Sequence, residues 1–531
     1  MKKAWNIFKV TLFTLVFTLI AVPVSLYIIL STQWAQNDIR KVAVSELSAL
    51  LGTDVSLGQI EIHPFNRLSI HDITALDDNG NTALSVEEVS VAFELFYLLR
   101  TGRLVIDFAL IDGPDVALYK ATKDSPLNIA EILSNLKSDK PARQSRYDLK
   151  VNTVIIRNGK MNYDILDAPR RDSVFDINHL CFKDVFLNAY IPRISNNEYR
   201  VEIDRFSFAE SNSIRLQDLK AVAHVTPTSS TLEHLTIVFP HSSLSFSPVT
   251  LDYHNFSDLY EEFINKGVTI DIMPGSIIYP PDFSGFAIGL NNLTDSVEIT
   301  LNANIAANSL QIDRLTLSQI NEKFSGTLSA NIDSLSSGVD ADYTLYDLRF
   351  SASQAGINTL LKLLPESTQN KVAKQLSGLK PSAYLSLSVS ASGKIKDSNA
   401  NARLALGDNA LTLSAHYSTP DTFKTVTLKS NAKLTFDDLT FVKSPNAPTA
   451  LRGHLTANAR LKGKNHTLSA NLDSAYVTYK GHRYGRLSIK VDSDPTNLSG
   501  EIYSEDPDIN FGGQCALQLN KGHKTIEASL D

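Results

Sequence analysis

The side chains best suited to chemistry in the first part of the chain are acidic, amide and histidine residues. The stretch Asp77-Asp78-Asn79-Gly80-Asn81 gathers carboxylate and amide oxygens, as calcium loops do. It lacks the 12-residue ligand spacing and the closing Glu of such a loop, so it predicts a plain turn. His63 and His71 lie too far apart for a local metal pair. We therefore expect no metal site, and we expect the twelve histidines at surface or edge positions.

Motifs of known catalytic chemistry are missing from the chain. The sequence contains no G-x-S-x-G, P-loop, H-E-x-x-H, C-x-x-C or D-F-G pattern. The two cysteines, Cys181 and Cys515, are widely separated, and two unrelated buried thiols are favoured over a disulfide. So few cysteines also argue against structural zinc. The sequence therefore predicts a protein that is not an enzyme and that has no cofactor.

The charge balance excludes a further class of function. The net charge is −7, and the 50 Lys and Arg residues are dispersed along the 531-residue chain. A nucleic-acid-binding protein would concentrate basic residues on one face or in one segment. No nucleic-acid partner is therefore expected.

An uncharged run from Val10 to Leu30 indicates a membrane helix. A helix of 21 residues at about 1.5 Å per residue just crosses a hydrocarbon core of about 30 Å. Lys2, Lys3 and Lys9 precede the run, and the next basic residue is Arg40, which predicts a cytoplasmic N-terminus and an exported remainder. A cleaved secretory signal is the alternative, but the run exceeds the usual apolar region and no A-x-A-like site follows it.

The chain after the membrane run begins with an amphipathic pattern. We predict a helix over residues 31–52 that ends at Gly52 and packs against the start of the next structure. The residues assigned to its apolar face are Ile39, Val42, Val44, Leu47, Leu50 and Leu51.

From residue 53 the hydrophobic period changes to two, which predicts short strands in a meander. At about 12 residues per strand and turn, roughly 36 strands are expected. Asn128 is a candidate N-cap for a short helix over 128–137, and Asn158-Gly159 predicts a tight hairpin. A helix pair broken at Pro365 interrupts the strands.

These patterns divide the chain into segments. The chain stops within a strand-like run, which suggests a fragment of a longer protein or an unprotected last strand. The expected segments are a cytoplasmic N-terminus (1–9), a transmembrane helix (10–30), an amphipathic helix (31–52), a first β unit with a short helix (53–140), a continuing β-groove region (141–350), a helical insertion (351–380) and further β repeats (381–531).

The first 165 residues resemble the N-terminus of the AsmA-like superfamily, which includes the TamB-type proteins. The order of elements is similar, and the Gly113-Pro114 turn before an edge strand is the most recognisable part. The stretches that carry the resemblance are LLGTDVSLGQIEI (50–62), LSIHDI (68–73), VEEVSVAF (86–93), IDFALIDGPDVALYK (106–120) and NIAEIL (128–133).

The resemblance implies a place and a role for the protein. It implies a periplasmic protein of a diderm bacterium, anchored in the inner membrane by a single pass. The implied role is outer-membrane biogenesis through phospholipid transport between the two membranes. The older description of the family is translocation and assembly of outer-membrane or secreted proteins, with an outer-membrane β-barrel as a partner.

The alternating pattern is compatible with an elongated, twisted, groove-like sheet with one apolar face. Moving an acyl chain of about 16 carbons through water costs more than about 10 kcal/mol, and an apolar groove would remove most of that barrier. The residues expected to line the groove and to contact phospholipid acyl chains are Val89, Val91, Phe93, Leu104, Ile106 and Phe108.

Two other arrangements fit the same alternation. Exposed edge strands could hold unfolded outer-membrane proteins by β-augmentation, which would make the protein an assembly scaffold. An adhesin-like array of β-sandwiches would instead form closed cores of about 100 residues. Alternation alone does not separate one open groove from several sandwiches.

Overall fold

The computed structural model describes most of the chain after residue 26. The residues described are 9, 11, 13–14, 17–18, 21, 24–25, 27–63, 66–94, 97, 100–101, 105–130, 132, 134, 150–171, 174–195, 198–211, 213–255, 259–319, 323–364, 366–420, 424–442, 447–463, 465–520 and 523–530.

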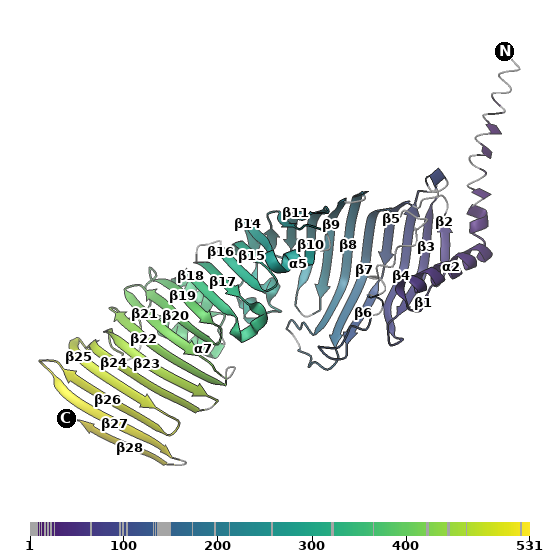
Figure 1. Cartoon of the computed structure of the whole chain (residues 1–531). Helices are drawn as coiled ribbons and strands as arrows, with labels where there is room; N and C mark the ends of the chain where they lie inside the picture. The colour runs from purple at the N-terminus through teal and green to yellow at the C-terminus, as the bar shows by residue number, and fades with distance from the viewer. Residues whose placement is uncertain are drawn as a thin grey trace. The chain divides into compact units, whose positions relative to one another are not determined.

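The described chain is mainly β, as the sequence predicts. It contains 28 strands and a few short helices (Figure 1). The expected number of strands was too high because several strands are long: β7 (Lys150–Ile165) has 16 residues and β8 (His179–Ser195) has 17. Residues 1–243 with 282–288 form the first compact unit, and residues 244–281 with 289–531 form the second.

The first unit contains one well-described helix and the strands β1 to β11. Its remaining strands are β1 (Val55–Ser56), β2 (Ile60–His63), β3 (Arg67–Leu76), β4 (Thr82–Phe93), β5 (Val105–Asp112), β6 (Asp115–Lys120), β9 (Glu198–Glu210), β10 (Arg215–Val225) and β11 (Ser229–Val238).

The amphipathic helix predicted after the membrane run is present as α2 (Gln33–Leu51) (Figure 1). Thr32 caps its start, and Gly52 ends it in the left-handed conformation with φ of 70°. Ala43, Val44, Leu47 and Leu51 pack on the first strands, so the helix does cover the start of the sheet. The predicted face was too broad.

Two residues assigned to that face point away from the sheet. Val42 is 62% exposed and Leu50 is 57% exposed. The buried side is therefore a narrower stripe of residues three and four positions apart.

The strand β7 corrects two expectations. Asn158-Gly159 does not form a hairpin; it lies inside β7, where Asn158 has φ of 56°. The register against β8 shifts at this point, so the pair forms a β-bulge. β7 also runs parallel to β5 and β6, whereas a meander predicts antiparallel neighbours.

The second unit is an antiparallel sheet in which each strand from β14 to β28 pairs with the next. Its strands are β12 (Ser243–Ser245), β13 (Val249–Asp252), β14 (Val268–Ile278), β15 (Val297–Ile305), β16 (Ser309–Gln319), β17 (Phe324–Asp333), β18 (Asp342–Ser353), β19 (Tyr384–Lys394), β20 (Asp397–Leu406), β21 (Asn409–Ser418), β22 (Thr425–Phe436), β23 (Ala450–Lys462), β24 (Asn465–Tyr479), β25 (His482–Ser493), β26 (Asn497–Glu505), β27 (Asn510–Asn520) and β28 (His523–Leu530).

The helices of this part are short. They are α5 (Leu259–Lys266), the 3₁₀ turns η2 (Pro280–Phe283), η3 (Ile288–Asn292) and η4 (Leu335–Asp340), and the pair α6 (Gln354–Leu361) and α7 (Glu366–Leu376). The last two confirm the predicted helix pair between strands; Pro365 lies outside the described residues. Ile357 of α6 and Leu376 of α7 pack with Phe324 and Ala352 at the ends of β17 and β18.

The predicted membrane helix over 10–30 falls largely outside the described residues. Among the residues that are described, no helix is both long and apolar enough to cross a membrane. Half of the predicted short helix over 128–137 lies outside the described residues; of those that are described, 130, 132 and 134 are helical. The polar stretch that follows also lies outside the described part.

Candidate functional site

A continuous row of large apolar side chains crosses the sheet of the first unit. Residues paired directly across neighbouring strands project to the same face. Following these pairs from β2 to β11, without β6, gives one apolar residue on every strand. We call this the first row; its members are Ile60, Ile70, Val89, Ile111, Ile156, Leu187, Phe206, Leu219 and Ile237.

A second row runs beside the first on the same face. It lies two residues away on each strand, or three on β9 where the register shifts, and it contains smaller side chains at several positions. Its members are Ile62, Leu68, Val91, Ala109, Val154, Ala189, Ile203 and Ala221. Together the two rows make one face of this sheet apolar over most of its strands.

The second unit repeats this arrangement over more strands. One row of register pairs runs through every strand from β14 to β28 without a polar residue. We call it the long row; its members are Ile272, Leu301, Leu315, Leu328, Leu348, Val389, Ala402, Leu413, Ala432, Leu455, Leu472, Ile489, Ile502, Gly513 and Leu530.

The opposite face of this sheet is polar. Successive residues of a strand point to opposite faces of the sheet. Thr412 and Thr456 are next to Leu413 and Leu455 of the long row, and both threonines are exposed on the opposite face. One row on the polar face contains only hydroxyl, amide and charged residues from β19 to β28. Its members are Ser390, Asn401, Ser414, Asn431, Thr456, Asn471, Lys490, Glu501, Gln514 and Ser529.

The apolar face of the second unit is not a closed core. Leu404, Leu428 and Leu468 point to this face and remain 38%, 39% and 37% exposed. Residues of a sandwich core would be almost fully buried. The helix pair α6 and α7 packs near one end of β17 to β20, where Phe350, Leu385 and Leu406 join its core. The face therefore presents a broad apolar surface that water reaches.

Four of the six predicted lining residues lie together. Val89 belongs to the first row and Val91 to the second. Phe93 follows them on the same face of β4, and Ile106 of β5 is its partner. All three residues of β4 are half-buried. The period of two placed them correctly relative to one another.

Phe108 does not join this group. It pairs with Ala92, whose side chain points to the face opposite that of Val91. The register shifts between Ala92 and Phe93, so Asp107 is an extra residue in β5, and strict alternation between positions 106 and 108 is lost. Leu104 lies outside the described residues.

The polar face of the first unit contains a group of hydrogen-bonded side chains. The hydroxyls of Ser69 and Ser90 lie 2.5 Å apart, and Ser90 donates to Glu88 at 2.6 Å. His63 Nε2 lies 3.4 Å from Ser69 Oγ and 3.9 Å from Glu61, so the same nitrogen faces both groups. A catalytic triad needs the carboxylate on the other ring nitrogen. This arrangement therefore offers no oriented general base.

An ion pair also lies on that face. Arg157 donates to Asp112 at 2.7 Å. This hydrogen bond, opposed by partial burial, holds the pKa of Asp112 below its ordinary value. Asn158, the bulge residue, donates to the same carboxylate at 2.7 Å, which explains why the polar Asn is placed within a strand.

The acidic turn at 77–81 is structural, as predicted. Asp77 Oδ1 accepts from the backbone N–H groups of Asn79 and Asn81 at 2.9 and 2.8 Å. Its Oδ2 accepts from Tyr119 and Asn128. Burial alone would raise the pKa of Asp77, but these hydrogen bonds lower it. Among the described residues, no cluster of His, Cys, Asp or Glu could hold a metal ion.

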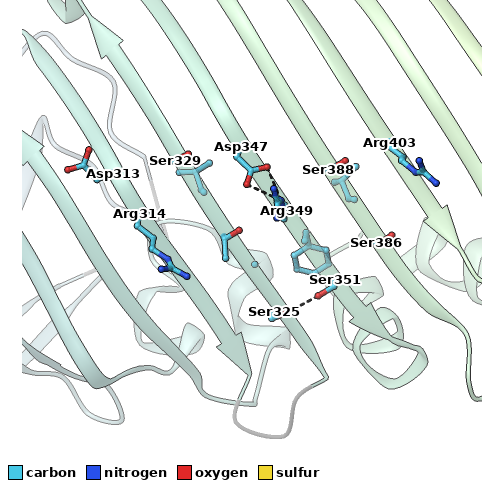
Figure 2. A pocket seen from close by; sticks show the side chains of 15 residues that line it. Asp313, Arg314, Ser325, Ser329, Asp347, Arg349, Ser351, Ser386, Ser388 and Arg403 are labelled. Atoms are coloured by element: carbon cyan, nitrogen blue, oxygen red, sulfur yellow. Dashed lines mark hydrogen bonds and ion pairs between the residues drawn. The ribbon is translucent and has the colours of Figure 1, made fainter.

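The polar face of the second unit contains a hollow of about 590 Å³, which sequence reasoning missed (Figure 2). Three arginines from β16, β18 and β20 line it, together with serine and threonine hydroxyls from β17 to β19. The signal was present in the sequence only as isolated arginines on strands far apart in the chain. Their common position depends on the register of five strands.

The chain has no match among known protein families, curated proteins or solved structures.

Proposed function

We propose that this protein binds phospholipid acyl chains on its apolar sheet face and carries them between the inner and outer membranes of a diderm bacterium. The anchor would be the apolar run at 10–30, with the N-terminus in the cytoplasm and the sheet in the periplasm. The proposal combines the AsmA-like resemblance of the N-terminal sequence with the face described above. In this role the sheet would act as an apolar groove.

The observation that supports the proposal most is the uninterrupted long row. An acyl chain gains about 0.8 kcal/mol for each CH₂ that leaves water, so a carrier surface must avoid polar gaps. The long row supplies an apolar side chain on every strand from β14 to β28 except β27, where its member is Gly513. At a strand spacing of about 4.8 Å, a chain of 16 carbons would contact about four strands at once. It could shift by one strand while it keeps most of its contacts.

A second function is favoured by a separate feature, the strand β28. Ile526 and Leu530 of β28 are 73% and 79% exposed. Exposed apolar side chains can also contact segments of another polypeptide. This favours the alternative of a scaffold for outer-membrane or secreted proteins.

Site-specific photocrosslinking separates the two functions. A photoreactive phenylalanine analogue would replace Leu413 on the apolar face, Thr412 on the polar face or Ile526 on β28, in the full chain in cell envelopes. Transport of lipid requires phospholipid adducts at 413 and none at 412. Polypeptide adducts at 413 or 526 without lipid at 413 would replace the lipid proposal by the scaffold. Equal lipid adducts at 412 and 413 would contradict use of the apolar face.

A further inference from the structure

The hollow on the polar face of the second unit is built from arginines separated by small hydroxyl residues. Arg349 of β18 pairs in register with Thr327 on one side and Ser388 on the other, and Ser388 pairs with Arg403 of β20. Arg349 and Arg403 are thus two strands apart, or about 9.6 Å at the ordinary spacing. Ser388 lies between the two arginines. Its short side chain leaves a space that a longer side chain would fill.

Two of the three arginines lack a polar partner among the described residues. Arg314 and Arg403 are exposed, and neither has a hydrogen bond or ion pair in the part of the chain that is described. A cationic side chain on a sheet is stabilised when an acidic residue lies opposite it on the neighbouring strand. Here the residues paired with Arg403 are Ser388 and Thr412, which carry no charge.

The third arginine is held in place by its neighbour. Arg349 Nε lies 3.1 and 3.0 Å from the two carboxylate oxygens of Asp347 (Figure 2). This contact uses the inner nitrogen of the guanidinium and leaves its two terminal amino groups for another acceptor. Asp347 also balances one of the three positive charges. The other acidic residue at the hollow, Asp313, accepts a hydrogen bond from Gln311 at 2.7 Å.

Hydroxyl groups complete the lining. Ser325 and Ser351 form a hydrogen bond of 2.8 Å to each other, and Ser386 and Ser388 come from the neighbouring strand (Figure 2). A tetrahedral oxyanion suits such a lining because it can accept charge-assisted hydrogen bonds from guanidinium groups and further bonds from hydroxyls. A neutral or cationic ligand would leave two unpaired arginines facing it.

We propose that this hollow binds a phosphate group, with Arg349 and Arg403 as the principal donors and Arg314 at its border. The three arginines repel one another when their guanidinium groups point into the hollow together. A bound anion would offset this repulsion. The hollow lies on the face opposite the long row, because Arg403 adjoins Ala402, which is a member of that row. A lipid whose chains lie on the apolar face would not place its headgroup here, so the inference does not depend on the proposed lipid transport.

Calorimetric titration of the full chain with inorganic phosphate in gentle detergent tests the proposal. We expect saturable binding with a Kd on the order of 1 mM, weakened by added salt. The variant Arg349→Gln/Arg403→Gln should bind at least ten times more weakly. A wild-type protein without saturable binding up to tenfold above that concentration would overturn the proposal.

A charge-matched control excludes a general effect of net charge. Lys429→Gln/Lys433→Gln removes the same two charges from the polar face, and neither lysine lines this hollow. We expect less than a twofold change in Kd for the control, and an equal loss in both variants would contradict a built site. Circular dichroism would confirm that both variants fold.

Vesicles distinguish the source of the phosphate group. Sedimentation with vesicles of phosphatidylglycerol, compared with vesicles of phosphatidylcholine, measures recognition of an exposed lipid headgroup. Binding to the anionic vesicles that is lost in Arg349→Gln/Arg403→Gln would identify a membrane surface as the source. Binding of inorganic phosphate alone would identify a soluble phosphorylated ligand. Absence of phosphate binding would overturn the phosphate site whatever the vesicles show, and it would leave the proposal for the apolar face unchanged.

Discussion

Val89 on β4 lies directly opposite Ile111 on β5, and each also has an apolar partner on its other side. Ile70 of β3 pairs with Val89, and Ile156 of β7 pairs with Ile111. The same side chains therefore join four strands and form the apolar surface. In a sheet whose apolar face is half-exposed, stability and the surface proposed to bind lipid depend on the same contacts.

This relationship predicts energetic coupling between the two residues. We expect Val89→Ala and Ile111→Ala each to reduce the protection of β4 and β5 by about 1 kcal/mol. The loss in the double variant should differ from the sum of the two single losses by about 0.2–1 kcal/mol, because the two side chains are in direct contact. Hydrogen exchange measured by mass spectrometry on peptides from β4 and β5 gives these values. Val89→Ala combined with Leu219→Ala, far along the same row, is the additive control; coupling of that pair as strong as the first would refute the prediction.

A second prediction concerns the glycine that follows α5. Gly267 has φ of 68°, and a Cβ at this position would lie 2.6 Å from the backbone oxygen of Ile305. Gly275, in the same unit, has φ of 87° with nothing within 4 Å of its Cβ position. An alanine at either site meets a backbone cost of about 1–2 kcal/mol, and only Gly267→Ala adds a clash with main chain. Thermal unfolding should show a clearly larger loss for Gly267→Ala than for Gly275→Ala. Equal losses would contradict the prediction, because they would mean that the backbone at Ile305 moves away from the new Cβ at little cost.

A third prediction is a pH dependence at His179. Its Nδ1 lies 2.9 Å from Asp164 Oδ1 and its Nε2 lies 3.0 Å from the carbonyl oxygen of Ala168. Only the protonated ring donates to both, and the hydrogen bond with Asp164, opposed by burial, raises the pKa of His179 above 6.5. Asp176 also raises this pKa, and Arg170 shares the Asp164 carboxylate.

The sign of the effect follows from this shift. Because the pKa of His179 is higher in the folded state than in the unfolded state, protonation of its ring stabilises the folded protein. This stabilisation is fully present below about pH 6.5 and is lost as the pH rises through the pKa of the folded state. The thermal midpoint of the first unit should therefore fall as the pH rises from about 6.5 through the folded pKa of His179. The variant His179→Gln should lose this dependence. A midpoint with the same pH profile in both proteins would contradict the assignment.

Local signals in the sequence were sufficient for several features. The end of α2 at Gly52 and the turn at Asp77 depend on residues close in sequence, and both were predicted. The period of two was enough to place Val89, Val91 and Phe93 on one face. Asn128 shows the limit of such reasoning, because its side chain makes contacts that the local pattern does not predict. Its oxygen accepts from the backbone N–H of Tyr119, and its amide donates to Asp77.

Other features depended on register, which sequence does not reveal. Phe108 was assigned to the wrong group because the bulge at Asp107 changes the alternation within β5. Asn158 resembles a hairpin residue locally, yet its contact with Asp112 belongs to another strand. The arginine hollow arises only when β16 to β20 are aligned. Each of these depends on pairing between distant segments, which a single sequence leaves open.

The most direct test of the central claim is the amount of phospholipid bound to the purified full chain. Lipid would be extracted after purification in gentle detergent and counted by mass spectrometry. Leu413→Asp/Leu455→Asp places two charges in the long row, and Thr412→Asp/Thr456→Asp places the same charges on the polar face of the same strands. We predict bound phospholipid on the parent and the threonine variant, and at least a threefold loss on the leucine variant. Equal amounts on both variants, or a parent without lipid, would contradict acyl-chain binding by the apolar face.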